Sequence, residues 1–184
     1  MKLKPQKCRL ARREVTFLGH IVAEEGILPD PDNVAKVKEW PQPKTAEELL
    51  SFLGLCGYYS RFVENYSEST RLLREAAARK GPLQWSHKMD KAFEVLKVKL
   101  TSAPMLALPS CKGSFRIDTD ACNTSVGAVL TEIVDGQEHV IAYASKVLSK
   151  VKKGGRHRTV GDRMGDSTFS AIFSRNAVCR VYGS

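Results

Sequence analysis

SFRIDTDA, at residues 114–121, is the point at which the chain changes from a helical to an alternating hydrophobic period. Successive side chains of a strand point to opposite faces, so one face of this segment would carry Arg116, Asp118 and Asp120. The segments 126–134 and 139–145 are also expected to be strands, and the Asp135-Gly136 pair between them is a strong signal for a hairpin turn. Three meandering antiparallel strands are therefore expected, in a sheet that is incomplete because no long helix follows to cover it.

The residues before this sheet carry helical patterns. Thr45 and Glu48 have the spacing of a capping box, in which Thr45 caps the helix and Glu48 reaches back. The helix that follows is expected to run to about Asn65, with a buried stripe of Leu49, Phe52, Leu53, Cys56, Tyr59 and Val63. Further helices are expected after Asp30-Pro31, around 70–79 and after Ser86. Helices followed by meandering strands predict an α+β fold.

A second stripe of the long helix holds Leu50, Gly54, Tyr58 and Arg61. Glycine in a helix interior costs about 1 kcal/mol relative to alanine, so Gly54 and Gly57 suggest that something requires a flat surface there. Packing against another helix explains the two glycines equally well.

Near the start of the chain, residues 15–22 read VTFLGHIV and predict a strand interrupted by Gly19. A glycine inside such a run suggests a bulge or a close backbone approach. The turn at 24–26 would let Ile27-Leu28 pair back, which makes a structural hairpin the simplest interpretation of the segment.

The formal net charge is +9, but the basic residues are concentrated at the two ends. Residues 1–13 carry +6 and residues 146–184 carry +7, which leaves −4 for residues 14–145. A basic protein suggests a nucleic-acid partner, although solvated basic tails explain this distribution equally well. After residue 150 no hydrophobic period is sustained, so residues 151–184 are expected to be disordered or marginally folded.

The five cysteines are odd in number and lack the spacing of a zinc site, which favours free, reduced thiols. No run of about 18 apolar residues is present, so no membrane span is expected. The basic N-terminus is not followed by the apolar run of a secretory signal. Residence in the cytoplasm or the nucleus is therefore expected, rather than secretion.

Four segments, taken in order, resemble the Pol polyprotein of gypsy-type LTR retrotransposons and related retroviruses. The first is FLGHIV at 17–22 with the residues up to Pro31, and the second is WPQPKT at 40–45 leading to SFLGLCGYYSRF at 51–62. The third is TSAP at 101–104 leading to DTDA at 118–121 and VGAVL at 126–130, and the fourth is IAYAS at 141–145. The resemblance covers roughly residues 1–150.

The resemblance implies a division of the chain. Residues 1–29 would be the end of a reverse transcriptase palm, with a primer-grip-like hairpin formed by Phe17, Leu18, Gly19 and His20. Residues 30–110 would be the helices of the thumb and the connection, and residues 111–150 a truncated ribonuclease H-like domain. Residues 151–184 would be a divergent tail.

The same resemblance implies a partner. Gly54, Tyr58 and Arg61 of the thumb helix would lie along the minor groove of a template–primer, where glycine permits a close approach and an aromatic ring contacts sugar or base edges. The expected partners are an RNA–DNA hybrid or another nucleic-acid duplex, and other segments of Pol.

Ribonuclease H chemistry uses two Mg²⁺ ions about 3.5–4 Å apart, held by a cluster of carboxylates. By resemblance, Asp120 is the first catalytic carboxylate and metal ligand, whereas Asp118 does not match a catalytic position. The partner carboxylates expected after residue 150 are absent, and Asp162 is only a faint counterpart. Asp118 and Asp120 are equally compatible with a solvated strand face.

The Tyr/Phe-x-Asp-Asp sequence of the polymerase site is also absent. The leading hypothesis is a catalytically incomplete fragment of a retroelement reverse transcriptase and ribonuclease H that retains duplex binding. The alternatives are an active or partner-assisted ribonuclease H-type endonuclease and a host-adopted interaction module.

Overall fold

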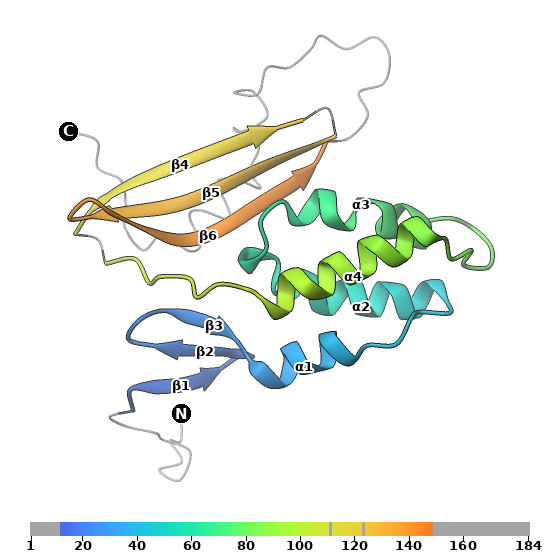
Figure 1. Cartoon of the computed structure of the whole chain (residues 1–184), viewed down its shortest axis with the longest axis horizontal. Coiled ribbons are helices and arrows are strands. Elements are labelled where there is room, and N and C mark those ends of the chain that lie inside the picture. Colours follow the sequence, from blue (N-terminus) through green and yellow to red (C-terminus); the bar gives the residue numbers. More distant parts are fainter. Residues whose placement is uncertain (1–11, 111, 123, 149–184) are drawn as a thin grey trace, which may run out of the picture.

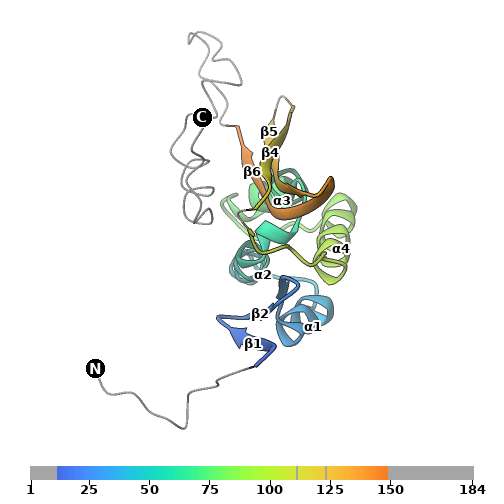
Figure 2. The ribbon, with the colours of Figure 1, turned by 90° about the vertical axis from the view of Figure 1, so that its left-hand side faces the viewer.

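The computed structural model describes residues 12–110, 112–122 and 124–148. Its elements, in chain order, are β1 (Glu14–Phe17), β2 (His20–Ala23), β3 (Ile27–Pro29), α1 (Pro31–Glu39), α2 (Ala46–Tyr58), the 3-10 turn η2 (Ser60–Phe62), α3 (Tyr66–Ala77), α4 (His87–Thr101), β4 (Ser114–Ala121), β5 (Ser125–Val134) and β6 (Gln137–Val147). Helices α2, α3 and α4 lie between two three-stranded sheets (Figure 1), and Figure 2 shows the same order of layers from the side. The α+β prediction is confirmed.

The first sheet has the strand order β1-β2-β3 and is antiparallel throughout. Leu18 and Gly19 form the turn between β1 and β2, with φ of 47° and 68°. The expectation of one interrupted strand over 15–22 is wrong, because this turn reverses the chain and pairs Phe17 with His20. The hairpin implied by the family resemblance and the return of Ile27-Leu28 against β2 are both confirmed.

Thr45 caps α2 as predicted, and Glu48 reaches back, but to the N–H of the residue before the cap. The Glu48 N–H donates to Thr45 Oγ1 at 3.2 Å, and the Glu48 carboxylate accepts from the Lys44 N–H at 2.7 Å. The whole stripe predicted for this helix is buried, and it packs with α3 and α4 in one hydrophobic core: Leu49, Phe52, Leu53, Cys56, Tyr59 and Val63. Burial of such side chains stabilises the fold by about 1.5–3 kcal/mol each.

The predicted end of this helix at Asn65 is wrong, because α2 ends at Tyr58. The Tyr59 N–H bonds back to the carbonyls of Cys56 and Gly57, and a 3-10 turn follows. Asn65 then adopts a left-handed conformation, with φ of 53°, and starts α3. This break turns the chain so that α3, which begins at Tyr66 rather than near residue 70, packs on the second sheet.

The second sheet has the order β4-β5-β6, so β4 is an edge strand in the described part of the chain. Asp135 and Gly136 form the predicted hairpin turn, with φ of 52° and 79°. Asp118 lies opposite Val129 and Asp120 opposite Gly127, so the two carboxylates share a face as predicted. Figure 1 shows α3 beneath this sheet.

The segment between α4 and β4 joins the two sheets. Leu106 forms an antiparallel bridge with Ile27, in which the two N–H···O distances are 2.7 and 3.0 Å. The next residue, Ala107, donates its N–H to the carbonyl of Val140 at 2.8 Å. One extended segment therefore pairs with β3 on one side and with β6 on the other.

Residues 1–11 and 149–184 lie outside the described residues, and so do the predictions for the basic N-terminus and the divergent tail. Three of the cysteines, Cys8, Cys111 and Cys179, lie outside them as well. No helix among the described residues is long and apolar enough to cross a membrane.

Replacing Gly26 tests the junction between the linker and the first sheet. Gly26 has φ of 154°, and an added Cβ would lie 2.4 Å from the carbonyl oxygen of Leu106. We expect Gly26→Ala to lower the free energy of unfolding by roughly 2–3 kcal/mol, measured by urea denaturation. Gly81 also has positive φ, 105°, but nothing lies within 4 Å of its added Cβ. Gly81→Ala therefore reports backbone strain alone, and we expect it to lower the free energy of unfolding by about 1 kcal/mol. Equal losses of stability in the two variants would show that Gly26 is not packed against Leu106.

Candidate nucleic-acid interface

Two neighbouring tyrosines, Tyr58 at the end of α2 and Tyr59 at its C-cap, hold the turn of the β1–β2 hairpin. The Tyr58 hydroxyl donates to the carbonyl of Leu18, and the Tyr59 hydroxyl donates to the carbonyl of Gly19 at 2.8 Å. Asn33 Nδ2 donates to the Tyr59 hydroxyl at 2.9 Å, which fixes the direction of the Tyr59 proton. The hairpin tip is therefore positioned by a helix 40 residues further along the chain.

Gly19 permits this contact. An added Cβ would lie 3.1 Å from the Tyr59 hydroxyl oxygen and 3.3 Å from Asn33 Nδ2, and the residue has positive φ. The close approach suggested by the sequence at Gly19 is confirmed, with side chains of α1 and α2 as the neighbours. A larger residue would push the tip off the helix.

His20 faces inward from the same turn. Its ring centroid lies 5.2 Å from that of Tyr58, 5.5 Å from that of Tyr59 and 5.7 Å from that of Phe62. Its Nδ1 lies 2.9 Å from the carbonyl oxygen of Leu18, whereas its buried Nε2 has no hydrogen-bond partner among the described residues. His20, one of the four predicted primer-grip residues, therefore packs beneath the hairpin tip.

The other side of the tip is exposed. Phe17 and Leu18 retain 62% and 70% of their accessible surface, a large exposure for apolar side chains. Leu50 and Tyr58 of α2 are also more than half exposed, and no atom lies within 4 Å of a Cβ added at Gly54. Because Tyr58 bonds to Leu18, these residues form one surface, here called the tip–helix face: Phe17, Leu18, Leu50, Gly54 and Tyr58.

Gly57 and Arg61 do not share the surface of Gly54 and Tyr58. A Cβ added at Gly57 would lie 3.5 Å from the Tyr66 hydroxyl oxygen. Both residues line a hollow that β6 also borders. Arg61 is only partly exposed, because the chain has left α2 for the 3-10 turn. Gly57 therefore fits the packing interpretation of the two glycines, and Gly54 fits the flat-surface one.

Asp118 and Asp120 border a hollow of about 170 Å³, together with Glu64, Asn65 and residues 127–129 of β5. Asp118 accepts from Arg116 Nε at 2.8 Å, and the same guanidinium binds Glu138 through two hydrogen bonds of 2.8 Å. These two carboxylates raise the pKa of Arg116. Asp118 is thereby held in an ion pair, whereas no cation in the described part of the chain pairs with Asp120.

A two-ion site needs several carboxylates at one point. In residues 12–110, 112–122 and 124–148, no group of three or more His, Cys, Asp and Glu side chains is placed to hold a metal ion. The described residues therefore do not fit a two-metal centre at Asp120.

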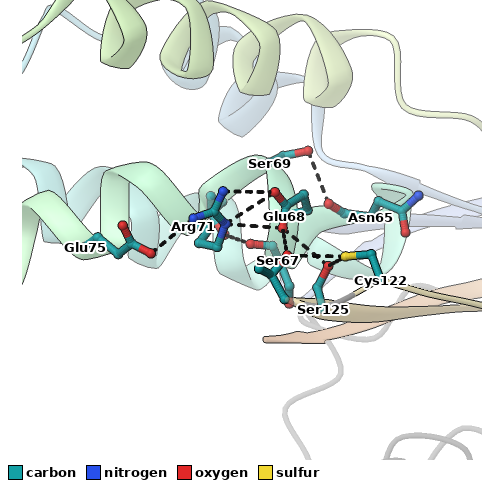
Figure 3. Close-up of polar contacts among 10 residues, drawn as sticks. Asn65, Ser67, Glu68, Ser69, Arg71, Glu75, Cys122 and Ser125 are labelled. Carbon is teal, nitrogen blue, oxygen red and sulfur yellow. Dashed lines mark hydrogen bonds and ion pairs between the residues drawn. The ribbon is translucent and has the colours of Figure 1, made fainter. Parts of the chain in front are cut away.

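A polar network holds the β4–β5 turn on α3, and sequence analysis missed it. Glu68 accepts from Thr124 Oγ1 at 3.1 Å. It also accepts from Ser125 Oγ at 3.3 Å (Figure 3). Arg71 donates to the same carboxylate and lowers the pKa of Glu68. No periodicity links residues 56 positions apart, so only the fold reveals this contact. Its effect is to fix the end of β4, just beyond Asp120, against the helical layer.

Cys122 lies in the same network and is exposed. Its sulfur lies 3.2 Å from the hydroxyl oxygens of Ser125 and Thr124, and these groups, with the backbone N–H of both residues, lower the pKa of Cys122 to about 7. Cys56 differs, because burial raises the pKa of its thiol to about 12.

The two thiols should react differently. The thiolate is the reactive form, so the alkylation rate of Cys122 by iodoacetamide should rise with pH through a midpoint near 7, while Cys56 stays inert in the folded protein. Peptide mass spectrometry resolves the two sites. Ser125→Ala should move the Cys122 midpoint upward, and Ser102→Ala should leave it unchanged. A midpoint at the ordinary value of about 8.5, insensitive to Ser125→Ala, would contradict the network.

Comparison with known proteins places this geometry in a family. The model of the RNase H-like domain found in reverse transcriptase matches residues 85–158. The retrovirus-related Pol polyprotein from transposon 412 of Drosophila melanogaster is 36% identical over 150 residues, which are 82% of this chain and 12% of that protein. An uncharacterized mitochondrial protein, AtMg00860, of Arabidopsis thaliana is 41% identical over 112 residues, which are 60% of this chain and 70% of that protein.

Among solved structures, the foamy viral protease-reverse transcriptase in complex with an RNA/DNA hybrid superposes with a TM-score of 0.74 at 23% identity. The match covers 93% of this chain and 23% of that one, and it shows the fold. The chain thus spans about an eighth of the length of the transposon 412 polyprotein. It belongs to the Pol polyproteins of retrotransposons and retroviruses, and corresponds to the region from the C-terminal part of the reverse transcriptase into the ribonuclease H-like domain.

Proposed function

We propose that this chain binds RNA–DNA hybrid or a related duplex through the tip–helix face and is catalytically incomplete as a ribonuclease H. The observation that carries the proposal is the bond from the Tyr58 hydroxyl to the Leu18 carbonyl. This bond joins the two segments expected to bind nucleic acid, which are 40 residues apart in sequence, into a single exposed surface.

The shape of the tip–helix face suits a groove. Gly54 leaves a flat patch on α2 between Leu50 and Tyr58, since no atom lies within 4 Å of its added Cβ. The minor groove of an RNA-containing duplex is wide and shallow and is recognised by shape and sugar contacts. A flat helix face flanked by an aliphatic and an aromatic side chain can approach such a groove closely.

The positive charge that would attract the phosphates of a duplex lies outside the tip–helix face. Phe17, Leu18, Leu50, Gly54 and Tyr58 are uncharged, whereas the first thirteen residues carry +6. Arg12 and Arg13 of that segment are exposed immediately before β1. Phosphate contacts by basic residues supply affinity that falls with salt, while the tip–helix face would supply the fit to the groove.

The relative of known structure gives independent support for the ligand class. The foamy viral protein was solved in complex with an RNA/DNA hybrid. A hybrid is therefore the first duplex to test with this chain.

Asp120 is proposed as the position of the first metal ligand of a ribonuclease H site. Mg²⁺ is the cofactor expected for such a site, because hard cations bind carboxylate oxygens. Asp120 and Asp118 are the acidic residues of β4, and Asp118 is paired with Arg116. One free carboxylate is too few to organise two ions.

Gly54→Leu separates binding from stability. The side chain enters open space and removes a helix-interior glycine, so the free energy of unfolding should rise, by up to about 1 kcal/mol. The same side chain blocks the close approach, so affinity for a fluorescent hybrid should fall on the order of tenfold, or about 1.4 kcal/mol. Anisotropy titrations at several salt concentrations measure the affinity.

Ala78→Leu, at the exposed C-terminal end of α3, is the matched control and should bind hybrid as the unmodified protein does. Hybrid affinity that is unchanged by Gly54→Leu would contradict the placement of the duplex on α2. Unmodified protein that shows no salt-dependent binding would instead favour the interaction-module alternative.

Catalytic incompleteness makes a separate prediction. The purified full chain should not cleave the RNA strand of a hybrid in Mg²⁺ above the level of an Asp120→Asn variant, as followed by gel electrophoresis. Mg²⁺-dependent cleavage that Asp120→Asn abolishes would establish the ribonuclease H-type endonuclease in its place. Asp118→Asn serves as the control, because Asp118 does not match a catalytic position.

A further inference from the structure

A second candidate site lies where η2 and α3 meet β6. It is a hollow of about 390 Å³, here called the Arg61 hollow, and its polar lining includes Ser60, Arg61, Tyr66, Ser67, Arg74, Tyr143 and Ser145. Two guanidinium groups and several hydroxyls border this hollow, and none of the described residues that line it is acidic.

Arg61 is a partly buried cation without a counter-charge. Its Nε is buried and has no hydrogen-bond partner, and no described residue forms an ion pair with it. Its guanidinium carbon lies 5.9 Å from the ring centroid of Phe62, a contact that provides no hydrogen-bond acceptor for the buried Nε–H. Desolvation also lowers the pKa of Arg61. Taking a charged group partly out of water costs free energy unless an opposite charge or hydrogen bonds compensate it, and a bound anion would supply that compensation to Arg61.

Two other arginines, neither of them buried, have acidic partners that Arg61 lacks among the described residues. Arg71 on α3 pairs with Glu68 and Glu75. Arg116 on β4 pairs with Asp118 and Glu138. Acidic partners are thus supplied within the described chain to those two guanidinium groups, while the two that border the Arg61 hollow receive none.

Arg74 is the second cation of the hollow. It is an exposed residue on α3, its Nε donates to Thr70 Oγ1 at 3.3 Å, and its guanidinium also interacts with the Tyr66 hydroxyl. Its guanidinium carbon lies 5.9 Å from the ring centroid of Tyr66. The hydroxyls of Ser67 and Ser145 bond to each other 3.1 Å apart at the sheet side of the hollow. Donors therefore approach the hollow from η2 and from α3.

We propose that the Arg61 hollow binds a phosphate group, held between Arg61 and Arg74 with the Ser60 hydroxyl as a further donor. Guanidinium groups match the oxygens of phosphate and carry their charge at all accessible pH values. Two cations from different elements suit a tetrahedral oxyanion better than a planar carboxylate with a single charge. This proposal does not rest on duplex binding by the tip–helix face, because none of the five residues of that face lines the hollow.

The first experiment uses inorganic phosphate alone. The full chain is titrated at constant ionic strength, with chloride as the exchanged anion, and the Nε–Hε signals of its arginines are followed by NMR. We expect a saturable shift of the Arg61 signal and no shift of the Arg79 signal. Arg79 is an exposed arginine just beyond α3 and outside the hollow.

Variants assign the site. Arg61→Gln should weaken phosphate binding about tenfold or more, Arg74→Gln should weaken it as well, and Arg79→Gln, which removes the same charge, should not. Calorimetry measures the affinity, and Arg61→Lys guards against misfolding because it retains the cation. No saturable Arg61 shift in the unmodified protein, or equal phosphate affinity in Arg61→Gln and Arg79→Gln, would overturn the proposal.

A second arm distinguishes the source of the phosphate. If it belongs to a nucleic-acid backbone, Arg61→Gln should lower hybrid affinity and reduce the salt slope of binding by about one. If it belongs to a free phosphate-bearing molecule, Arg61→Gln should weaken inorganic phosphate binding and leave hybrid affinity unchanged. The phosphate arm contains no nucleic acid, so its failure is separable from failure of duplex binding, which Gly54→Leu reports.

Discussion

The pair of hydrogen bonds from Tyr58 and Tyr59 to the carbonyls of Leu18 and Gly19 sets the geometry of the candidate interface. Without them, a two-residue turn with a leucine at φ of 47° would have little reason to be ordered, because left-handed backbone is unfavourable for leucine. The bonds also place His20 against Tyr58 and Tyr59 and leave Phe17 and Leu18 facing outward. The hairpin and helix residues that the family resemblance assigns to nucleic-acid binding thereby lie on one surface, although they are far apart in sequence.

Sequence patterns predicted those elements that are determined by residues close together in the chain. The helix cap at Thr45, the buried stripe of α2 and the Asp135-Gly136 turn all form as their patterns indicate. The end of α2 was not predictable in this way, because Tyr59 and Val63 continue the helical spacing through a break that tertiary packing imposes. The Leu18-Gly19 turn was hidden for a similar reason: it lies in an apolar run, and its stabilising partners are on another helix.

The candidate sites divide along the same line. The alternating pattern correctly placed Asp118 and Asp120 on one face of β4, but it could not show that Asp118 forms an ion pair with Arg116. The stripe on α2 grouped Arg61 with Gly54 and Tyr58, whereas the 3-10 turn carries Arg61 to a hollow beside β6. The Glu68 network, which fixes the β4–β5 turn on α3, joins residues with no sequence relation. Asp120 is thus held in a defined place by a fold that supplies it with no metal-binding partners among the described residues.

Mapping a bound hybrid onto the backbone shows whether the tip–helix face is the nucleic-acid interface. Amide signals of the full chain would be followed by NMR while an unlabelled RNA–DNA hybrid is added at physiological salt. We expect the largest shifts on Leu18–His20 and on α2 from Leu50 to Tyr58, the two segments that the tyrosine hydroxyls join. Shifts confined to the basic ends of the chain, with Gly54 and the hairpin tip unmoved, would contradict this interface.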